Sequence, residues 1–260
     1  MSAGPPARGT RLVVPCFDEA ARLRDATFLD ALAERPWLGL LFVDDGSRDA
    51  TPARLEALVA RAGGRTSLLR LPENRGKGEA VRAGLRAALA REGTAFVGYW
   101  DADGATPFAE LDRLVAHLEA HPGLLGAIAS RRPGPDGEIR RSVFRGAAAR
   151  VSSRMIAWAL DAALRDTMCG AKLFRADARL ERALAEAFDT RWTFDVELLA
   201  RISADAGPGA GLGEIVHEVP IGRWQDVPGS KIRAADIARA PLDLLRIRRT
   251  RLARIRERGA

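Results

Sequence analysis

Two aspartates one residue apart, Asp101 and Asp103, have the type and spacing for metal chemistry. They follow the apolar run 95–100, which predicts a buried β-strand. Ligands of open α/β sheets bind beyond the carboxyl ends of the strands, and two carboxylates there repel each other unless a cation lies nearby. Mg²⁺ and Mn²⁺ accept carboxylate oxygens and complete their coordination with water and phosphate. The pair therefore indicates a metal–diphosphate site, with a turn carrying two solvated acids as the plainer alternative.

Other polar groups follow neighbouring apolar runs in the same way. Asp44 and Asp45 come after the run 40–43, and a Gly76-Lys77-Gly78 loop comes after the run 67–71. The loop is not a Walker loop, because no glycine stands five residues before Gly76 and no Ser or Thr follows Lys77. Its glycines allow a tight strand-to-helix turn, which leaves Lys77 free to approach a phosphate.

The elements that must position these residues alternate along the first half of the chain. Strands are expected at 11–17, 40–43, 67–71 and 95–100, and helices at 18–34, from 49 and from 79. This order predicts an α/β fold with a mostly parallel central sheet and helices on both faces. The second half is less regular, with strands expected at 124–129 and 215–220 and helices around 144–158 and from 191. In the first of these helices, an apolar stripe that includes Met155 and Trp158 is expected to pack in the core, with an acceptor groove as the alternative.

The composition allows one sizeable core, since 260 residues are 47% hydrophobic. No apolar run reaches the ~18 residues of a membrane span, and residues 1–10 lack the apolar centre of a signal peptide. The two cysteines, Cys16 and Cys169, give no disulfide framework or zinc spacing, which fits a reducing cytoplasm. We expect one body over 1–230, whose first half (1–130) is a nucleotide-binding type of α/β domain.

The net charge of +7 comes entirely from the last thirty residues, which hold ten Lys or Arg and three Asp or Glu. Such a basic tail on a neutral body indicates a polyanionic partner, either a membrane surface or a nucleic acid, or else a solvated helix. After Pro241 the residues Leu242, Leu245, Leu252 and Ile255 recur at helical spacing among arginines. This pattern predicts a basic amphipathic helix that can lie in a membrane interface.

Six segments in order resemble the GT-A glycosyltransferases of family 2, within them the dolichyl-phosphate glucosyltransferase and polyprenyl-phosphate sugar synthase group. Asp18 stands where this group usually has asparagine. The segments are Val14-Pro15-Cys16-Phe17-Asp18-Glu19-Ala20, Phe42-Val43-Asp44-Asp45-Gly46-Ser47, Asn74-Arg75-Gly76-Lys77-Gly78-Glu79-Ala80, Trp100-Asp101-Ala102-Asp103, Cys169-Gly170-Ala171-Lys172-Leu173-Phe174 and Gly229-Ser230-Lys231.

The resemblance implies a GT-A fold, a Rossmann-like nucleotide-diphospho-sugar transferase, and a role for each matching residue. It also implies that the body over 1–230 is a catalytic domain with a nucleotide-sugar-binding half (1–130) and an acceptor-binding half (131–230). Asp103 is expected to bind Mg²⁺ or Mn²⁺. Asp101, beside the donor sugar, and Asp195, on the acceptor side, are the expected catalytic carboxylates. The nucleotide-sugar donor is expected to contact Pro15, Phe17, Glu19, Asp44, Lys77, Asp101, Ala102, Arg131 and Lys231.

The implied reaction is inverting transfer of a hexose, most simply glucose from a UDP-sugar, to a polyprenyl phosphate at the cytoplasmic membrane face. A phosphate acceptor is already ionised at neutral pH, whereas an alcohol acceptor needs Asp195 as general base. Another donor such as GDP-mannose, or a soluble acceptor, is the nearest alternative. A nucleic-acid-binding protein using the basic tail and a binding-only relative are alternatives of another class. No nucleic-acid partner is expected, because the body is neutral and carries no RNA-binding motif.

Overall fold

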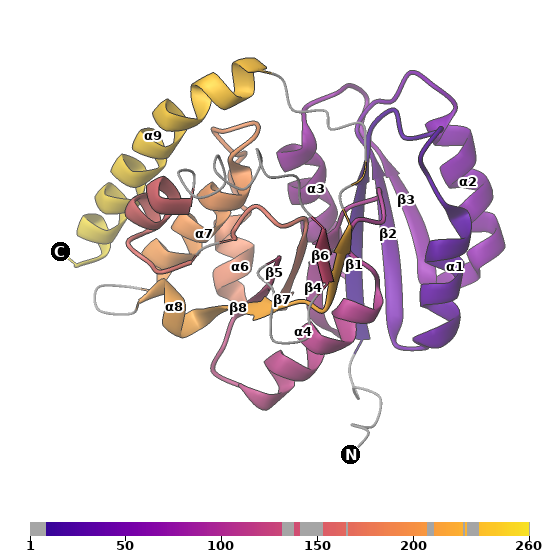
Figure 1. The fold of residues 1–260 in the computed structure, drawn as a ribbon, viewed down its shortest axis with the longest axis horizontal. Coiled ribbons are helices and arrows are strands. Elements are labelled where there is room, and N and C mark those ends of the chain that lie inside the picture. The colour runs from indigo at the N-terminus through magenta and orange to yellow at the C-terminus, as the bar shows by residue number, and fades with distance from the viewer. Residues whose placement is uncertain are drawn as a thin grey trace.

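The computed structural model describes residues 9–131, 138–140, 153–164, 166–206, 211–225, 227 and 234–259. Seven strands form a central sheet in the order β3-β2-β1-β4-β7-β5-β8, and two short strands, β6 and β9, form a second sheet (Figure 1). The strands of the central sheet are β1 (Gly9–Cys16), β2 (Leu38–Asp44), β3 (Thr66–Arg70), β4 (Thr94–Trp100), β5 (Gly126–Ser130), β7 (Ala171–Arg175) and β8 (Val216–Pro220).

The helices are α1 (Asp25–Glu34), α2 (Thr51–Ala62), α3 (Lys77–Leu89), α4 (Ala109–Ala120), α6 (Ala178–Ala183), α7 (Phe194–Asp205), α8 (Leu212–Ile215) and α9 (Ala234–Gly259), with a 3-10 turn η1 (Gly63–Arg65). Residues 153–160 are also helical. Among the described residues, none of the helices combines the length and apolar character needed to cross a bilayer.

The expected mostly parallel sheet is confirmed. β1 pairs in parallel with β2 and β4, β2 with β3, and β5 with β8, whereas β7 lies antiparallel between β4 and β5. The register sets Cys16 opposite Asp44 and Val13 opposite Tyr99. The carboxyl ends of β1, β2 and β4 therefore meet at one edge of the sheet.

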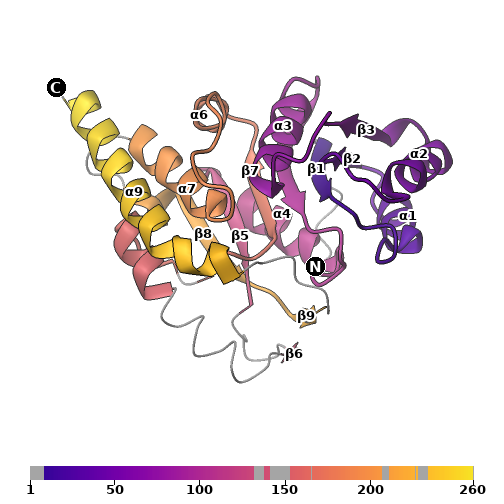
Figure 2. The ribbon, with the colours of Figure 1, turned by 90° about the horizontal axis from the view of Figure 1, so that it is seen from above.

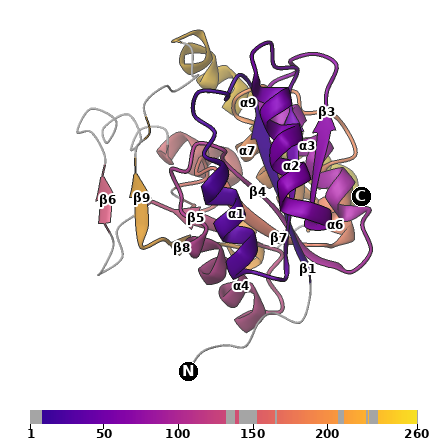
Figure 3. The same cartoon turned by 90° about the vertical axis from the view of Figure 1, so that its right-hand side faces the viewer.

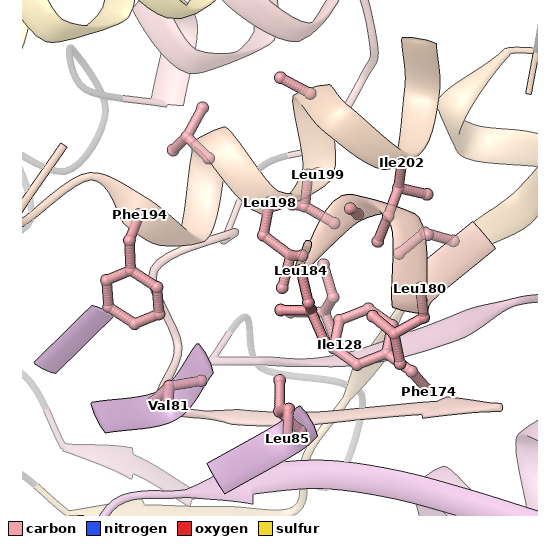
Figure 4. Close-up of a cluster of buried hydrophobic side chains, with 14 of the residues drawn as sticks. Val81, Leu85, Ile128, Phe174, Leu180, Leu184, Phe194, Leu198, Leu199 and Ile202 are labelled. Atoms are coloured by element: carbon pink, nitrogen blue, oxygen red, sulfur yellow. The ribbon is translucent and has the colours of Figure 1, made fainter. Parts of the chain in front are cut away.

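Successive side chains along each strand point to opposite faces of the sheet. On β1, Leu12 and Val14 pack with α1, α2 and α4, whereas Val13 points to the opposite face. That opposite face is covered by α3, α6, α7 and the helix at 153–160. Figure 4 shows Val81 and Leu85 of α3 and the leucines of α7 enclosing this core.

The small sheet stands to one side of the central sheet, as Figure 3 shows. It consists of β6 (Glu138–Arg140) and β9 (Arg223–Gln225), which pair in parallel. β6 and β9 both belong to the second half of the chain, and β9 follows β8 closely.

The first helix begins later than the sequence pattern predicts, at Asp25 instead of Asp18. Asp18 adopts a left-handed backbone conformation, with φ of 46°, which a helix cannot contain. Asparagine and aspartate both tolerate this conformation better than other non-glycine residues. Residues 18–24 therefore form a loop at the edge where β1 and β2 end.

Candidate active site

The loops that follow β1 and β2 are fastened to each other by side-chain hydrogen bonds. The backbone N–H groups of Asp18 and Glu19 donate to Ser47 Oγ at 2.9 Å and to Thr51 Oγ1 at 2.7 Å. The Asp18 carboxylate in turn accepts from the Arg48 N–H at 2.8 Å. These contacts build a rigid rim at the carboxyl ends of β1 and β2, on which the half-buried Pro15 and Phe17 also lie.

Two of the predicted donor-binding carboxylates are buried in this rim. Glu19 forms a two-pronged ion pair with Arg22, with Nε–Oε2 and Nη2–Oε1 distances of 2.8 and 2.6 Å. Asp44 is 1% exposed, accepts the Ser47 N–H at 3.1 Å and lies 3.9 Å from Arg70 Nε. Both side chains are therefore held in fixed orientations.

Asp45 shapes the neighbouring glycine loop. Its two carboxylate oxygens accept the backbone N–H groups of Arg75 and Gly76, each at 2.8 Å. Burial raises the pKa of Asp45, and these two hydrogen bonds oppose the rise. Gly76 has φ of 94°, a conformation that favours glycine, and it leads directly into α3. Asp45 thus determines where Lys77, the first residue of α3, is placed.

Lys77 and Asp101 meet at the centre of the edge, with Lys77 Nζ 2.5 Å from Asp101 Oδ1. Burial acts to lower the pKa of Lys77, but the charges of Asp101, Asp195 and Asp103 outweigh it and leave the pKa raised. Lys77 is therefore a fixed cation among three carboxylates. Ala102, between the two aspartates of the motif, is 8% exposed.

Asp103 has the chemistry of a metal ligand. Burial and the nearby charge of Asp101 raise its pKa, while the Ala105 N–H, which donates to Oδ1 at 3.0 Å, opposes the rise. A divalent cation beside this carboxylate would relieve the repulsion between the two acids. Within the described ranges no three His, Cys, Asp or Glu side chains form a ready metal cage. A single carboxylate ligand fits Mg²⁺ or Mn²⁺, which take their other ligands from water and phosphate.

Asp195 is in a buried charged cluster rather than alone at the start of α7. Its Oδ1 accepts from Lys172 Nζ at 2.5 Å and from the Tyr99 hydroxyl. Lys172 is fully buried, donates to the Cys169 carbonyl at 2.7 Å and lies 4.9 Å from the centre of the Tyr99 ring. Burial and the charge of Asp195 raise the pKa of Tyr99, so this phenol stays a donor. The catalytic role of Asp195 remains a prediction.

The loop before β7 lies against Asp101. Its Gly170 carbonyl accepts the Asp101 N–H at 2.9 Å. A Cβ on Gly170 would come within 1.9 Å of Asp101 Oδ2, so only glycine leaves room for this carboxylate. The segment Cys169–Phe174 therefore positions both expected catalytic carboxylates, one through Gly170 and one through Lys172.

Arg131 follows β5 and is fixed by Asp166. The guanidinium Nη2 lies 2.6 Å from Asp166 Oδ1, and Arg131 N–H donates to Oδ2 at 2.6 Å. Its Cζ lies 5.3 Å from the Trp224 ring centre. Burial acts to lower the pKa of Arg131, but the hydrogen bonds and the charge of Asp166 outweigh it and leave the pKa raised. Lys231, the remaining predicted donor-binding residue, lies outside the described residues.

The sequence interpretation gave no role to Lys172, Asp45 or Arg22. A lysine within the apolar strand Ala171–Arg175 is a signal of a buried ion pair, since lysine is almost never fully buried unpaired. The partner of such a lysine cannot be read from the strand alone. Asp45 carries the signal of an acid that follows a buried strand, but its contact with the glycine loop cannot be read from that signal. Arg22 shows no comparable signal, because it looks like an ordinary loop residue.

The expected tail is confirmed as a helix, and it has a second apolar side that the expected stripe does not include. Leu244 and Ile247, each 3% exposed, join the core on the α7 side, whereas Leu242 and Leu245 are exposed. The helix at 153–160 shows a similar split, because Met155 packs against the core but Trp158 is exposed. The expectation that Trp158 belongs to the core is therefore wrong.

Comparison with known proteins identifies the family. Glycosyl transferase family 2 matches residues 12–180 of this chain. A dolichyl-phosphate beta-glucosyltransferase of Drosophila melanogaster is 33% identical over 240 residues, which cover 85% of this chain and 68% of that protein. The human dolichyl-phosphate beta-glucosyltransferase is 28% identical over 242 residues, 87% of this chain and 70% of that protein.

Solved structures agree on the fold. Glucosyl-3-phosphoglycerate synthase from Mycobacterium tuberculosis, in complex with Mn²⁺, uridine-diphosphate-glucose and phosphoglyceric acid, superimposes with a TM-score of 0.65 at 18% identity. The superposition covers 94% of this chain and 80% of that one. The superposition shows that this chain has the GT-A fold, and the family match with the sequence relatives shows that it belongs to glycosyltransferase family 2.

Proposed function

We propose that this protein transfers glucose from UDP-glucose to a polyprenyl phosphate, with inversion, at the cytoplasmic face of a membrane. The observation that carries the proposal is the meeting of Lys77, Asp101 and Asp103 at the carboxyl edge of the sheet. The sequence relatives named dolichyl-phosphate beta-glucosyltransferase support the sugar and the lipid-phosphate acceptor. The synthase with bound Mn²⁺ and uridine-diphosphate-glucose supports the donor and the metal.

The rim residues hold the donor. Glu19 and Asp44 present carboxylate oxygens, which accept hydrogen bonds from the base and ribose, with Pro15 and Phe17 beside them. Lys77 and Arg131 bring positive charge to the diphosphate. A divalent cation on Asp103 would supply further positive charge where the nucleoside diphosphate leaves.

The acceptor side favours a phosphate over an alcohol. An acceptor phosphate oxygen forms the new bond to the anomeric carbon, and the bond to the nucleoside diphosphate breaks with its electron pair. No proton has to be removed from an ionised phosphate. Asp195 Oδ1 already accepts two hydrogen bonds, so the cluster suits a role in orienting the acceptor side.

Calorimetry with the purified protein tests the donor first. UDP-glucose, GDP-mannose and UDP-N-acetylglucosamine are each titrated with Mn²⁺ or with chelator. We expect UDP-glucose to bind in the presence of metal, followed by transfer of labelled glucose to polyprenyl phosphate but not to 3-phosphoglycerate. A folded protein that binds none of the donors contradicts the proposal. Transfer of glucose only to a soluble acceptor contradicts the lipid-phosphate acceptor and favours the alternative of a soluble acceptor.

A further inference from the structure

Three large apolar side chains are exposed among the described residues, and an arginine links them into one patch. They are Trp158 at 49%, Leu242 at 68% and Leu245 at 36% exposed. Arg248, one helical turn after Leu245, lies with its Cζ 4.6 Å from the Trp158 ring centre and donates to the Trp158 carbonyl. We call Trp158, Leu242, Leu245 and Arg248 the anchor patch.

The two leucines of the anchor patch, Leu242 and Leu245, do not attach α9 to the body. Leu244 and Ile247 make that attachment from the inward side of α9, and Arg251 adds a hydrogen bond to Ser203 Oγ at 3.1 Å. At about 100° per residue, Leu242 and Leu245 point away from Leu244 and Ile247. Exposed apolar side chains grouped in this way mark an interaction surface.

The charge around the anchor patch selects an anionic bilayer as its partner. α9 carries eight arginines and three carboxylates, and Arg246, Arg249 and Arg256 are exposed. Tryptophan is suited to the membrane interface because its ring is apolar and its N–H is polar. A helix whose outward side mixes leucine with arginine can lie flat in the headgroup region.

The patch also lies beside the acceptor end of the site. Asp243, between Leu242 and Leu244, has Oδ2 3.5 Å from Thr193 Oγ1, and Thr193 precedes α7 two residues before Asp195. Figure 2 shows α9 running alongside α7. A membrane bound to the first half of α9 is therefore next to the helix terminus that carries Asp195.

We propose that the anchor patch inserts into the interface of an anionic membrane and so holds the acceptor end of the site against the bilayer. Trp158 and the two leucines enter between the headgroups, and the exposed arginines contact anionic lipid. Only the purpose of this contact, delivery of a lipid phosphate, rests on the proposed function; the binding itself does not.

Vesicle sedimentation of the full chain tests the proposal, with phosphatidylcholine vesicles that contain or lack phosphatidylglycerol. We expect Leu242→Ser with Leu245→Ser to weaken partitioning at least tenfold. Arg249→Gln and Arg256→Gln are expected to weaken it about fivefold each on anionic vesicles. The matched control combines Arg61→Gln, on α2, with Arg91→Gln, which follows α3. This control is expected to partition as the wild type does. All substituted side chains are exposed, so circular dichroism should show no change in folding.

A Trp158→Phe variant adds a spectroscopic test. The fluorescence difference between wild type and this variant isolates Trp158, and we expect its emission to shift to the blue with anionic vesicles. Wild-type partitioning of the double-leucine variant overturns the proposal. Binding to RNA that needs the arginines but not the leucines overturns it in favour of a nucleic acid. Calorimetry of the variants with UDP-glucose separates the membrane proposal from the proposed function. A variant that no longer partitions into vesicles but still binds the donor has lost only the function of the anchor patch.

Discussion

Among single residues, Lys172 stabilises the buried charged cluster around Asp195. Its ammonium group is fully buried and has one carboxylate partner, Asp195. Removing one partner of a buried pair leaves an uncompensated charge, which typically costs about 3–5 kcal/mol. We therefore expect Lys172→Met to lower the free energy of unfolding by about that amount in urea denaturation.

A double variant separates stability from activity. Lys172→Met with Asp195→Asn removes both charges, so most of the lost stability should return. We expect this folded double variant to lack turnover, because it has lost the carboxylate that is predicted to act on the acceptor side. A double variant that is as unstable as Lys172→Met contradicts the assignment of the pair.

Asp103 is the residue that we propose as the metal ligand. We expect Asp103→Asn to leave the thermal midpoint unchanged and to lower metal-dependent turnover by at least about a hundredfold, because a bound metal contributes several kcal/mol of transition-state stabilisation. Asn can still accept the Ala105 N–H, so the turn is kept. Glu119→Gln, an exposed change on α4, is the control. Full activity of the folded Asp103 variant argues against the metal site.

At the scale of elements, the loop before β7 positions Asp101 by its lack of a side chain. Gly170→Ala places a Cβ against the Asp101 carboxylate and should displace it from Lys77. We expect kcat/KM to fall about tenfold or more while the fold persists, since small displacements of reacting groups are costly. Gly123→Ala, which has open space around it, should have no effect on turnover. Equal activities of the two variants contradict this role of Gly170.

The elements of the first half of the chain are predictable from sequence because their signals are local. The apolar run 95–100 ends at Trp100, where β4 also ends, and it begins one residue after the start of β4. The start of α1 is missed, because the left-handed Asp18 depends on hydrogen bonds to a loop thirty residues away. The partner of Lys172 is missed for a similar reason, since it lies on α7 and is reached only after β7 inserts into the sheet.

The packing of α9 on the body is not predicted, because its sequence carries two apolar stripes and the expected stripe is only one of them. Leu242 and Leu245 fit helical spacing as well as Leu244 and Ile247 do, and only the packing on α7 decides which pair is buried. The basic character of the helix is predictable from composition alone. Which side of it faces solvent is not.

At the scale of the whole molecule, α9 is part of the folded body. Removal of residues 241–260 deletes the buried Leu244 and Ile247, and each buried side chain of this kind contributes about 1.5–3 kcal/mol. We expect the truncated chain to unfold at lower urea concentration than the full chain. A truncated chain as stable as the full chain contradicts this packing. Truncation therefore cannot isolate membrane binding, whereas the exposed-face substitutions can.

Global stability should also depend on pH through Cys169. Burial raises the pKa of this thiol from 9.0 to about 11. Between these values the folded state binds the proton and the unfolded state releases it, so stability falls as pH rises, by about 1.4 kcal/mol per pH unit. Cys169→Ser should flatten the decline of urea midpoints measured from pH 9 to 11. Tyr99, whose pKa is also raised, adds a further decline at higher pH.

The antiparallel β7 has a consequence for engineering chimaeras of this enzyme. The chain passes β5 before β7 fills the gap between β4 and β5, so neither half completes its own sheet. A first half cut after residue 130 would leave one edge of β4 unpaired, which is a template for aggregation. Exchange of the second half between relatives thus requires a graft that keeps β7 with its host, with new segments joined on either side of it.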